Sequence, residues 1–355
     1  MHAMKTKCTL ISLLLFCSFA MASDQEQERK LKISQSKQFS AGKFQNMEAF
    51  SVIEGSYFGL FKELIFGKQV RVPLSPLPQV SFDSLELRDP PKDLQVIWLG
   101  HSTLLLEIEG KRLLVDPVLG SHASPVPIFA KRFQPPLLSR DQLPRIDAIV
   151  ISHDHYDHLE KETMEFFAAK AIPIYAPIGV GSHLKKWGVD AAYIHELDWW
   201  EELDFQGLRL VCTPAQHFSG RSLTDRNKTL WASWSIIGKQ HRVFYSGDGG
   251  YAGHLKTIGE KYGPFDLTLM ENGAYNKRWP HVHMFPEEVI KAHQDLRGKA
   301  LMPVHWGMFS LANHDWDEPI RRISVEAKKH DVRLLTPMIG QAVRPLESQE
   351  FLQWW

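Results

Sequence analysis

The chain has 355 residues, of which 44% are hydrophobic, so it is long enough to form a globular protein with a sizeable core. Lysine and arginine together number 41, as do aspartate and glutamate, which gives a formal net charge of zero. Proteins that follow a nucleic-acid backbone usually carry a basic excess. The charge balance therefore argues against nucleic acid as the partner.

The first 22 residues are typical of a secretory signal peptide. Lys5 and Lys7 supply positive charge before the apolar run 8–20, and a cleavage site with small residues, Ala20-Met21-Ala22, follows. The apolar run is short for a membrane span, so a retained anchor is the less favoured alternative. We expect an exported bacterial protein, periplasmic or membrane-associated. Cleavage would leave Cys212 as the one cysteine, and hence no internal disulfide.

Residues 23–93 are predicted to form an N-terminal arm ahead of the folded domain. The stretch 23–45 is polar and charged without an apolar period, which predicts a flexible lead-in. Residues 58–66 have the pattern of a short amphipathic helix, and prolines punctuate the chain after it. We favour docking of this helix on the core. Contact of its apolar face with a membrane surface is the alternative.

Residues 94–355 are predicted to form one α/β domain. Apolar runs predict strands at 96–99, 103–108, 112–116, 148–151, 172–176, 208–213, 231–237, 242–246, 267–270 and 300–304. Helical patterns lie at 161–169, 180–187, 255–261 and 286–296. The first three strands form a meander with a tight turn at Glu109-Gly110. The later alternation of strands and helices favours a layered α/β arrangement.

The most informative stretch is 151–159, directly after a predicted buried strand. Six consecutive positions hold five ionisable residues: His153, Asp154, His155, Asp157 and His158. Two histidines separated by one residue at a strand end can aim ring nitrogens at one Zn²⁺ from about 2.0–2.1 Å, while an Asp-His pair can serve a second ion. Such a concentration of charge fits neither a core segment nor an ordinary turn. It predicts a metal site.

Three later predicted strands run into further candidate ligands: His217, Asp248 and His305. Taken singly, a histidine or a Gly-Asp pair of this kind is more often structural. Their shared position at strand ends favours ligation, because strand ends at one edge of a sheet converge rigidly. With the opening motif they give seven candidate ligands. One allocation puts His153, His155 and His217 on one ion, Asp157, His158 and His305 on the other, and Asp248 between them.

These residues resemble the pattern of the metallo-β-lactamase fold hydrolases, and within them the branch that contains N-acylphosphatidylethanolamine-hydrolysing phospholipase D. The wider pattern is the His-x-His-x-Asp-His of 153–158 with the three later ligands. The branch is indicated by Trp98 to Thr103, Asp116-Pro117, Pro214 to Arg221, Leu223 to Trp231, Gly273-Ala274-Tyr275, Pro286-Glu287-Glu288 and His305-Trp306-Gly307. The resemblance implies a four-layer αββα sandwich of the α/β class, with two Zn²⁺ per chain at one edge.

The resemblance also implies roles for individual residues. It supports the same seven ligands, with Asp157 and His283 as catalytic residues. His283 would be an active-site imidazole that binds no metal, and His281 is its rival. His101 and Asp116 are expected either to orient ligands or to serve only as turn and strand-end residues. The chain departs from the branch at Asp154, Gly249 and Glu271-Asn272, which leaves the substrate open.

A pair of Zn²⁺ ions about 3.5–4 Å apart can lower the pKa of a shared water towards about 7 and hold the resulting hydroxide for attack. The first hypothesis is therefore a zinc-dependent phosphodiesterase of phospholipase D type that acts on N-acylphosphatidylethanolamine-like lipids. One alternative is a lactonase, amidase or esterase of the same fold, and another is a non-catalytic metal-binding module. A diiron redox centre is a further one, against which His155 at the second ligand position argues.

Overall fold

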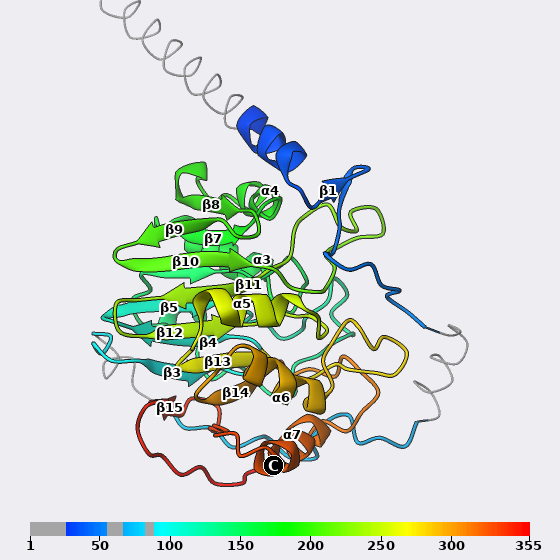
Figure 1. Cartoon of the computed structure of the whole chain (residues 1–355), viewed down its shortest axis with the longest axis vertical. Helices are drawn as coiled ribbons and strands as arrows, with labels where there is room; N and C mark the ends of the chain where they lie inside the picture. Colours follow the sequence, from blue (N-terminus) through cyan, green and yellow to red (C-terminus); the bar gives the residue numbers. More distant parts are fainter. Residues whose placement is uncertain (1–25, 55–66, 82–88) are drawn as a thin grey trace, which may run out of the picture.

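The computed structural model describes residues 26–54, 67–81 and 89–355 (Figure 1). The predicted signal peptide at 1–22 and the predicted amphipathic helix at 58–66 lie outside these ranges. Within the described residues, no helix is both long enough and apolar enough to cross a bilayer.

Two mixed sheets form the centre of the molecule. The first sheet contains, in spatial order, β15 (Ala342–Val343), β3 (Gln95–Trp98), β4 (Leu104–Ile108), β5 (Lys111–Val115), β6 (Ala148–Val150), β7 (Ile174–Pro177) and β8 (Ile194–Leu197). The second contains β14 (Leu301–Val304), β13 (Leu267–Glu271), β12 (Arg242–Tyr245), β11 (Ser233–Ile237), β10 (Leu208–Thr213) and β9 (Glu202–Phe205). The predicted meander is confirmed, since β3, β4 and β5 pair antiparallel in sequence order.

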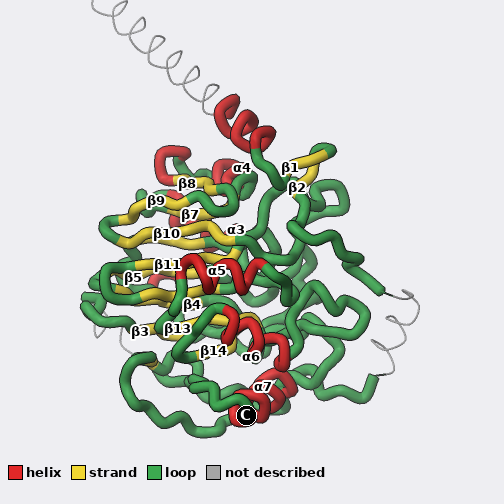
Figure 2. Tube along the Cα trace, viewed as in Figure 1, coloured by secondary structure: helices red, strands yellow, loops and turns green. Residues whose placement is uncertain are grey.

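Helices cover the outer faces of both sheets. They are α3 (Lys161–Ala168), α4 (Gly181–Lys186), α5 (His254–Tyr262), α6 (Pro286–Asp295) and α7 (Glu318–Lys329), with short 3₁₀ turns η1 (Arg140–Gln142) and η2 (Ala191–Tyr193). In Figures 1 and 2, α5 and α6 lie across the second sheet, and apolar residues of α3 and α4 pack on the first. The predicted αββα sandwich is therefore confirmed.

The residue pattern of the first sheet explains this layering. Leu104 and Leu106 of β4 join the main core between the sheets, while Leu105 joins the smaller core under α3 and α4. Side chains alternate between the two faces of a strand, so a strand that is buried at every position, as β4 is, must be covered on both sides. Strands β6 and β7, which are buried throughout, meet the same condition.

The N-terminal segment differs from the prediction of a flexible lead-in at 23–45. Residues 26–35 are helical, and β1 (Phe39–Ser40) pairs with β2 (Lys43–Phe44). Phe44 is fully buried in the main core, with its ring 5.0 Å from that of Phe39. The sequence did not predict that Phe44 anchors this segment to the core. A single buried aromatic ring within a polar stretch leaves no periodic pattern.

The hairpin of β4 and β5 holds a buried ion pair. Glu107 and Arg112 are opposite each other in register and both are completely buried. Arg112 donates from Nε to Glu107 Oε1 at 2.6 Å, and Gln95 donates to Glu107 Oε2 at 2.7 Å. Arg112 also donates to the carbonyl oxygen of Arg145. Both charges therefore have partners in a region that water does not reach.

We expect Glu107→Gln to lower the free energy of unfolding by about 3–5 kcal/mol, because it leaves the buried Arg112 guanidinium without a counter-charge. Urea denaturation measures the change. The matched control is Glu202→Gln, which breaks the exposed pair with Arg209 and should cost less than about 1 kcal/mol. Equal losses in the two variants would contradict the prediction.

Candidate metal centre

The candidate ligands follow four strands that belong to both sheets. The loop that begins at Ile151 leaves β6, His217 follows β10, Asp248 follows β12 and His305 follows β14. Strands β5 to β8 run parallel, as do β12 to β14, so their carboxyl ends share an edge. Gly247 has φ +56°, and a Cβ there would lie 2.6 Å from the carbonyl oxygen of Ala232. Only glycine lets the chain pass at this point to present Asp248.

One group of possible ligand atoms comes from His153, His155, His217 and Asp248, all within 4.8 Å of one another. His155 Nδ1 lies 2.9 Å from His153 Nε2 and 3.2 Å from His217 Nε2. Asp248 Oδ2 lies 3.8 Å from the Nε2 atoms of both His153 and His217. Three ring nitrogens and one carboxylate oxygen thus face a common point.

A second group contains Asp157, His158 and His305, with His101 beside them. Asp248 Oδ2 lies 3.1 Å from Nε2 of His158 and 3.1 Å from Nε2 of His305. Asp157 Oδ2 is 3.2 Å from His305 Nε2 and 3.4 Å from His158 Nε2. Asp248 therefore lies between the groups. The structure brings all seven predicted ligands together, in two neighbouring groups on either side of Asp248.

The chemistry of these atoms fits metal cations. His217 Nδ1 lies 3.1 Å from the carbonyl oxygen of Val282, which can only accept, so the proton is on Nδ1 and Nε2 presents a lone pair. Burial lowers the pKa values of His153 and His217 well below their usual range, which keeps both rings neutral. Among the described residues, the buried His158 Nε2 and Asp248 Oδ1 have no hydrogen-bond partner. Imidazole nitrogens with carboxylate oxygens are a ligand set that suits zinc.

The charges of the site also call for cations. Burial alone would raise the pKa values of Asp157 and Asp248, but the neighbouring imidazoles, His158 foremost, together outweigh it and hold both well below their usual range. Burial would likewise lower the pKa of His305, yet Asp248 and Asp157 raise it to about 10. Two buried carboxylates thus need positive charge beside them, which protonated imidazoles or divalent ions can supply.

Asp116 and His101 support the ligands. Asp116 Oδ2 accepts from His158 Nδ1 at 2.7 Å, from Ser152 Oγ at 2.5 Å and from Tyr245 at 2.5 Å. This fixes the His158 ring with Nε2 towards the centre. Burial lowers the pKa of His101 to about 3, and its Nε2 donates to Asp157 Oδ2 at 2.9 Å. Of the two expectations for these residues, contact with the ligands is the one that the geometry favours.

Asp154 points away from the centre. Its carboxylate accepts from Gly220 N at 2.8 Å and from Thr229 Oγ1 at 2.9 Å, and lies 3.2 Å from His183 Nε2. It therefore anchors the loop that carries the ligands to neighbouring segments.

His283, and not its rival His281, faces the candidate centre. The His283 ring stacks on His305 at 5.1 Å between centroids, whereas the side chain of His281 is about half exposed and points to Glu54. His283 Nδ1 lies 3.3 Å from Oε2 of Glu271, which is completely buried at the end of β13. Glu271 Oε1 accepts from Met284 N at 2.6 Å. The sequence marked Glu271 only as a departure from the family and did not predict this partnership.

The N-terminal segment contributes to the site, which the sequence did not predict. Asn46 donates from Nδ2 to His217 O at 2.7 Å, and its Oδ1 accepts from His217 N and from Trp231 Nε1, each at 3.1 Å. Val52 and Ile53 line the pocket over the centre, which has a volume of about 250 Å³. The other walls are mainly apolar, formed by Phe218, Ala274, Trp279, Val282 and Leu311.

The sequence matches the family model of the β-lactamase superfamily domain over residues 111–306, more than half of the chain. The chain belongs to the β-lactamase superfamily. It is 44% identical over 298 residues to an uncharacterised protein of Mycobacterium tuberculosis, covering 82% of this chain and 79% of that protein. As a member of this superfamily with the metallo-β-lactamase fold, it is a metal-dependent hydrolase.

A relative with a named activity is similar over a smaller part of its length. The N-acyl-phosphatidylethanolamine-hydrolyzing phospholipase D 1 of Caenorhabditis elegans is 36% identical over 233 residues, which cover 62% of this chain and 65% of that protein. Among solved structures, a possible metal-dependent hydrolase from Veillonella parvula superposes with a TM-score of 0.57 at 17% identity, covering 70% of this chain and 98% of that one. That likeness concerns the fold alone.

Removing divalent ions with a chelator should lower the melting temperature, because ions that bind the folded state alone stabilise it, by about 2.7 kcal/mol at 100 times the dissociation constant. Differential scanning fluorimetry measures the shift, and added zinc should reverse it. Asp248→Asn serves as the control, since it removes the carboxylate that both groups share and should make the melting temperature insensitive to chelator. An unchanged melting temperature of the native chain would contradict a metal centre.

Proposed function

We propose that this chain is a zinc-dependent phosphodiesterase of phospholipase D type that acts on N-acylphosphatidylethanolamine-like lipids. The observation that carries the proposal is the position of Asp248 between two ligand groups beneath an apolar pocket. The activity named for the Caenorhabditis elegans relative supports the substrate class. An acyl chain would find Phe218, Trp279 and Leu311 beside the centre.

His153, His155 and His217 would hold one zinc ion, and Asp157, His158 and His305 the other, with Asp248 shared. Bound zinc would supply Lewis acidity and make water acidic enough to ionise near neutral pH. The protein's own contribution is to fix the ligands through Asp116, His101 and the carbonyl of Val282.

His283 is the proposed acid that serves the leaving group. With Nδ1 held towards Glu271, its other ring nitrogen, Nε2, is directed away from that carboxylate, and the residue lines the pocket. A proton on Nε2 would be stabilised by the buried Glu271 carboxylate and could pass to a departing oxygen. Glu271 is thus a positioning residue for His283.

One feature of the pocket favours a second candidate, hydrolysis of a lactone, amide or ester. Among the described residues that line the pocket there is no lysine or arginine to meet the charge of a phosphodiester. A neutral carbonyl substrate would need none. The metal identity, export and signal cleavage after residue 22 stay predictions.

A side-by-side assay distinguishes the two functions. The zinc-loaded protein is given an N-acylphosphatidylethanolamine, a generic phosphodiester, a lactone and a β-lactam. We expect the highest kcat/KM with the N-acylated phospholipid, at least about tenfold above the generic diester, because the apolar walls add binding energy that the diester does not use. Asp157→Asn is the inactive control. Lactone turnover without phosphodiester cleavage would transfer the proposal to the second candidate.

Glu271→Gln should lower kcat by about 10- to 100-fold and leave KM and zinc content unchanged, because it removes the charge that supports a proton on His283. Steady-state kinetics with metal analysis measure both quantities. Glu287→Gln, an exposed carboxylate on α6, is the matched control. Full activity of His283→Gln would refute the role of this pair.

A further inference from the structure

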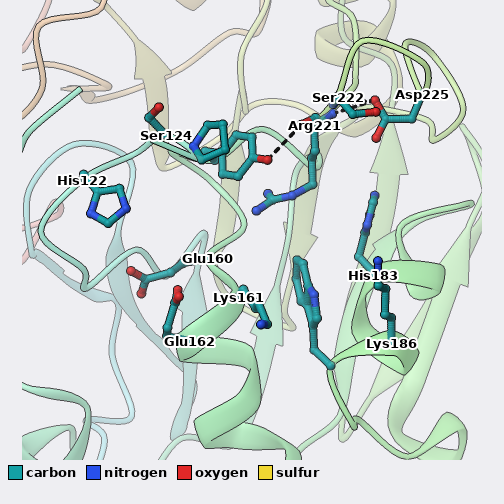
Figure 3. A pocket seen from close by; sticks show the side chains of 13 residues that line it. His122, Ser124, Glu160, Lys161, Glu162, His183, Lys186, Arg221, Ser222 and Asp225 are labelled. Atoms are coloured by element: carbon teal, nitrogen blue, oxygen red, sulfur yellow. Dashed lines mark hydrogen bonds between the residues drawn. The ribbon is translucent and has the colours of Figure 1, made fainter. Parts of the chain in front are cut away.

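A second cleft lies beside the loop of candidate ligands and shares no lining residue with the pocket over the metal centre (Figure 3). Its volume is about 470 Å³. Tyr156, which stands between the candidate ligands His155 and Asp157, forms part of its wall, together with residues of α3, α4 and the 221–225 loop. The hydrolytic site described above makes no use of this space.

Arg221 is the central residue of this cleft. Its guanidinium lies 3.9 Å from the ring centre of Tyr156 and 5.1 Å from that of Trp187. Nη1 donates to the carbonyl oxygens of Asp154 and Leu159, both at 2.7 Å. Across the part of the chain that the structure describes, no carboxylate oxygen forms an ion pair with it. The half-buried guanidinium thus has carbonyls and aromatic faces as its direct contacts, while the Asp154, Asp157 and Asp225 carboxylates act on it from beyond ion-pair distance.

Two lysines and a histidine line the same cleft. Lys186 makes no ion pair within the described ranges, and Lys161 has only an exposed pair with Glu165 at 3.4 Å, which is worth little. His183 also contributes to the wall. In Figure 3 Arg221 lies between Lys161 on one side of the cleft and His183 and Lys186 on the other. The wall thus contains one guanidinium and two ammonium groups.

The cleft also has three carboxylates in its wall, and two of them have hydrogen-bond partners of their own. Glu160 accepts from Leu119 N and Arg140, and Asp225 accepts from the backbone N–H groups of Arg221 and Ser222. Neither forms an ion pair with Arg221, Lys161 or Lys186 within the described ranges. Glu160 and Glu162 lie on the side of the cleft opposite His183 and Lys186 (Figure 3).

We propose that this cleft binds a phosphate-bearing anion. Arg221 would donate from the face that its carbonyl partners leave open, and Lys161 and Lys186 would add charge, as is usual where proteins recognise phosphate. The aromatic faces of Tyr156 and Trp187 hold the guanidinium in place. The volume leaves room for a small ester behind the phosphate. The proposal is independent of the hydrolytic function, since it uses none of that site's residues.

The test is calorimetric titration of the zinc-loaded protein with inorganic phosphate. We compare the native chain, the double variant Lys161→Met with Lys186→Met, and the control Lys170→Met with Lys185→Met, which removes the same charge outside the cleft. Lys185 neighbours Lys186 but pairs with Glu26 instead. Any phosphate that binds at the metal centre binds equally in all three proteins. A loss of phosphate affinity confined to the variant Lys161→Met with Lys186→Met therefore identifies the cleft as the binding site.

We expect the lysine pair at the cleft to weaken phosphate binding at least tenfold, and the control pair to change it less than twofold. Equal binding by all three proteins would overturn the proposal, as would an equal loss in both variants. Two further arms, glycerol 3-phosphate and phosphatidate vesicles, separate a soluble ester from a lipid headgroup. Tighter binding of either ligand that again depends on Lys161 and Lys186 supports the site. Binding that does not depend on these lysines counts against it. Melting temperature and zinc content verify that the variants fold.

Discussion

The rest of this structure depends on two ionised carboxylates, the buried Asp248 and the largely covered Asp157. Both are held ionised where the surrounding protein leaves little water, which is costly unless positive charge lies beside them. Four strand ends deliver that charge or its metal equivalent from both sheets at once. The two sheets therefore do more than position the ligands. Because they meet at this edge, they supply the positive charge that keeps both carboxylates ionised away from bulk water.

The support around the ligands is as buried as the ligands themselves. Asp116 alone collects hydrogen bonds from a ligand, from the serine next to the first ligand and from Tyr245 of the opposite sheet. The Asp116 side chain therefore links the ends of β5, β6 and β12. A substitution there would disturb the orientation of a ring and the junction of two sheets together, so its effects on activity and on stability would be hard to separate.

The sequence was informative where the signal was local. The strand followed by His153 to His158 revealed the centre because the ligands are adjacent, and the apolar runs predicted most strands of both sheets. It was uninformative for the contact between Glu271 and His283. Glu271 ends β13 and His283 lies in the loop before α6, and nothing in either segment indicates that they meet. Strands β8 and β9, with partly exposed residues, and helix α7, with polar residues around a narrow apolar stripe, also escaped prediction.

Asn46 is a single side chain, yet it ties a segment far from the hydrolase core in sequence to the backbone of a candidate ligand. A recombinant fragment that starts at residue 94 would keep both sheets and every ligand, but it would lose this brace along with the wall formed by Val52 and Ile53. The smallest unit that keeps both sheets and the smallest unit that keeps the whole pocket therefore do not coincide. In this chain the walls and braces of the pocket extend upstream at least to Asn46.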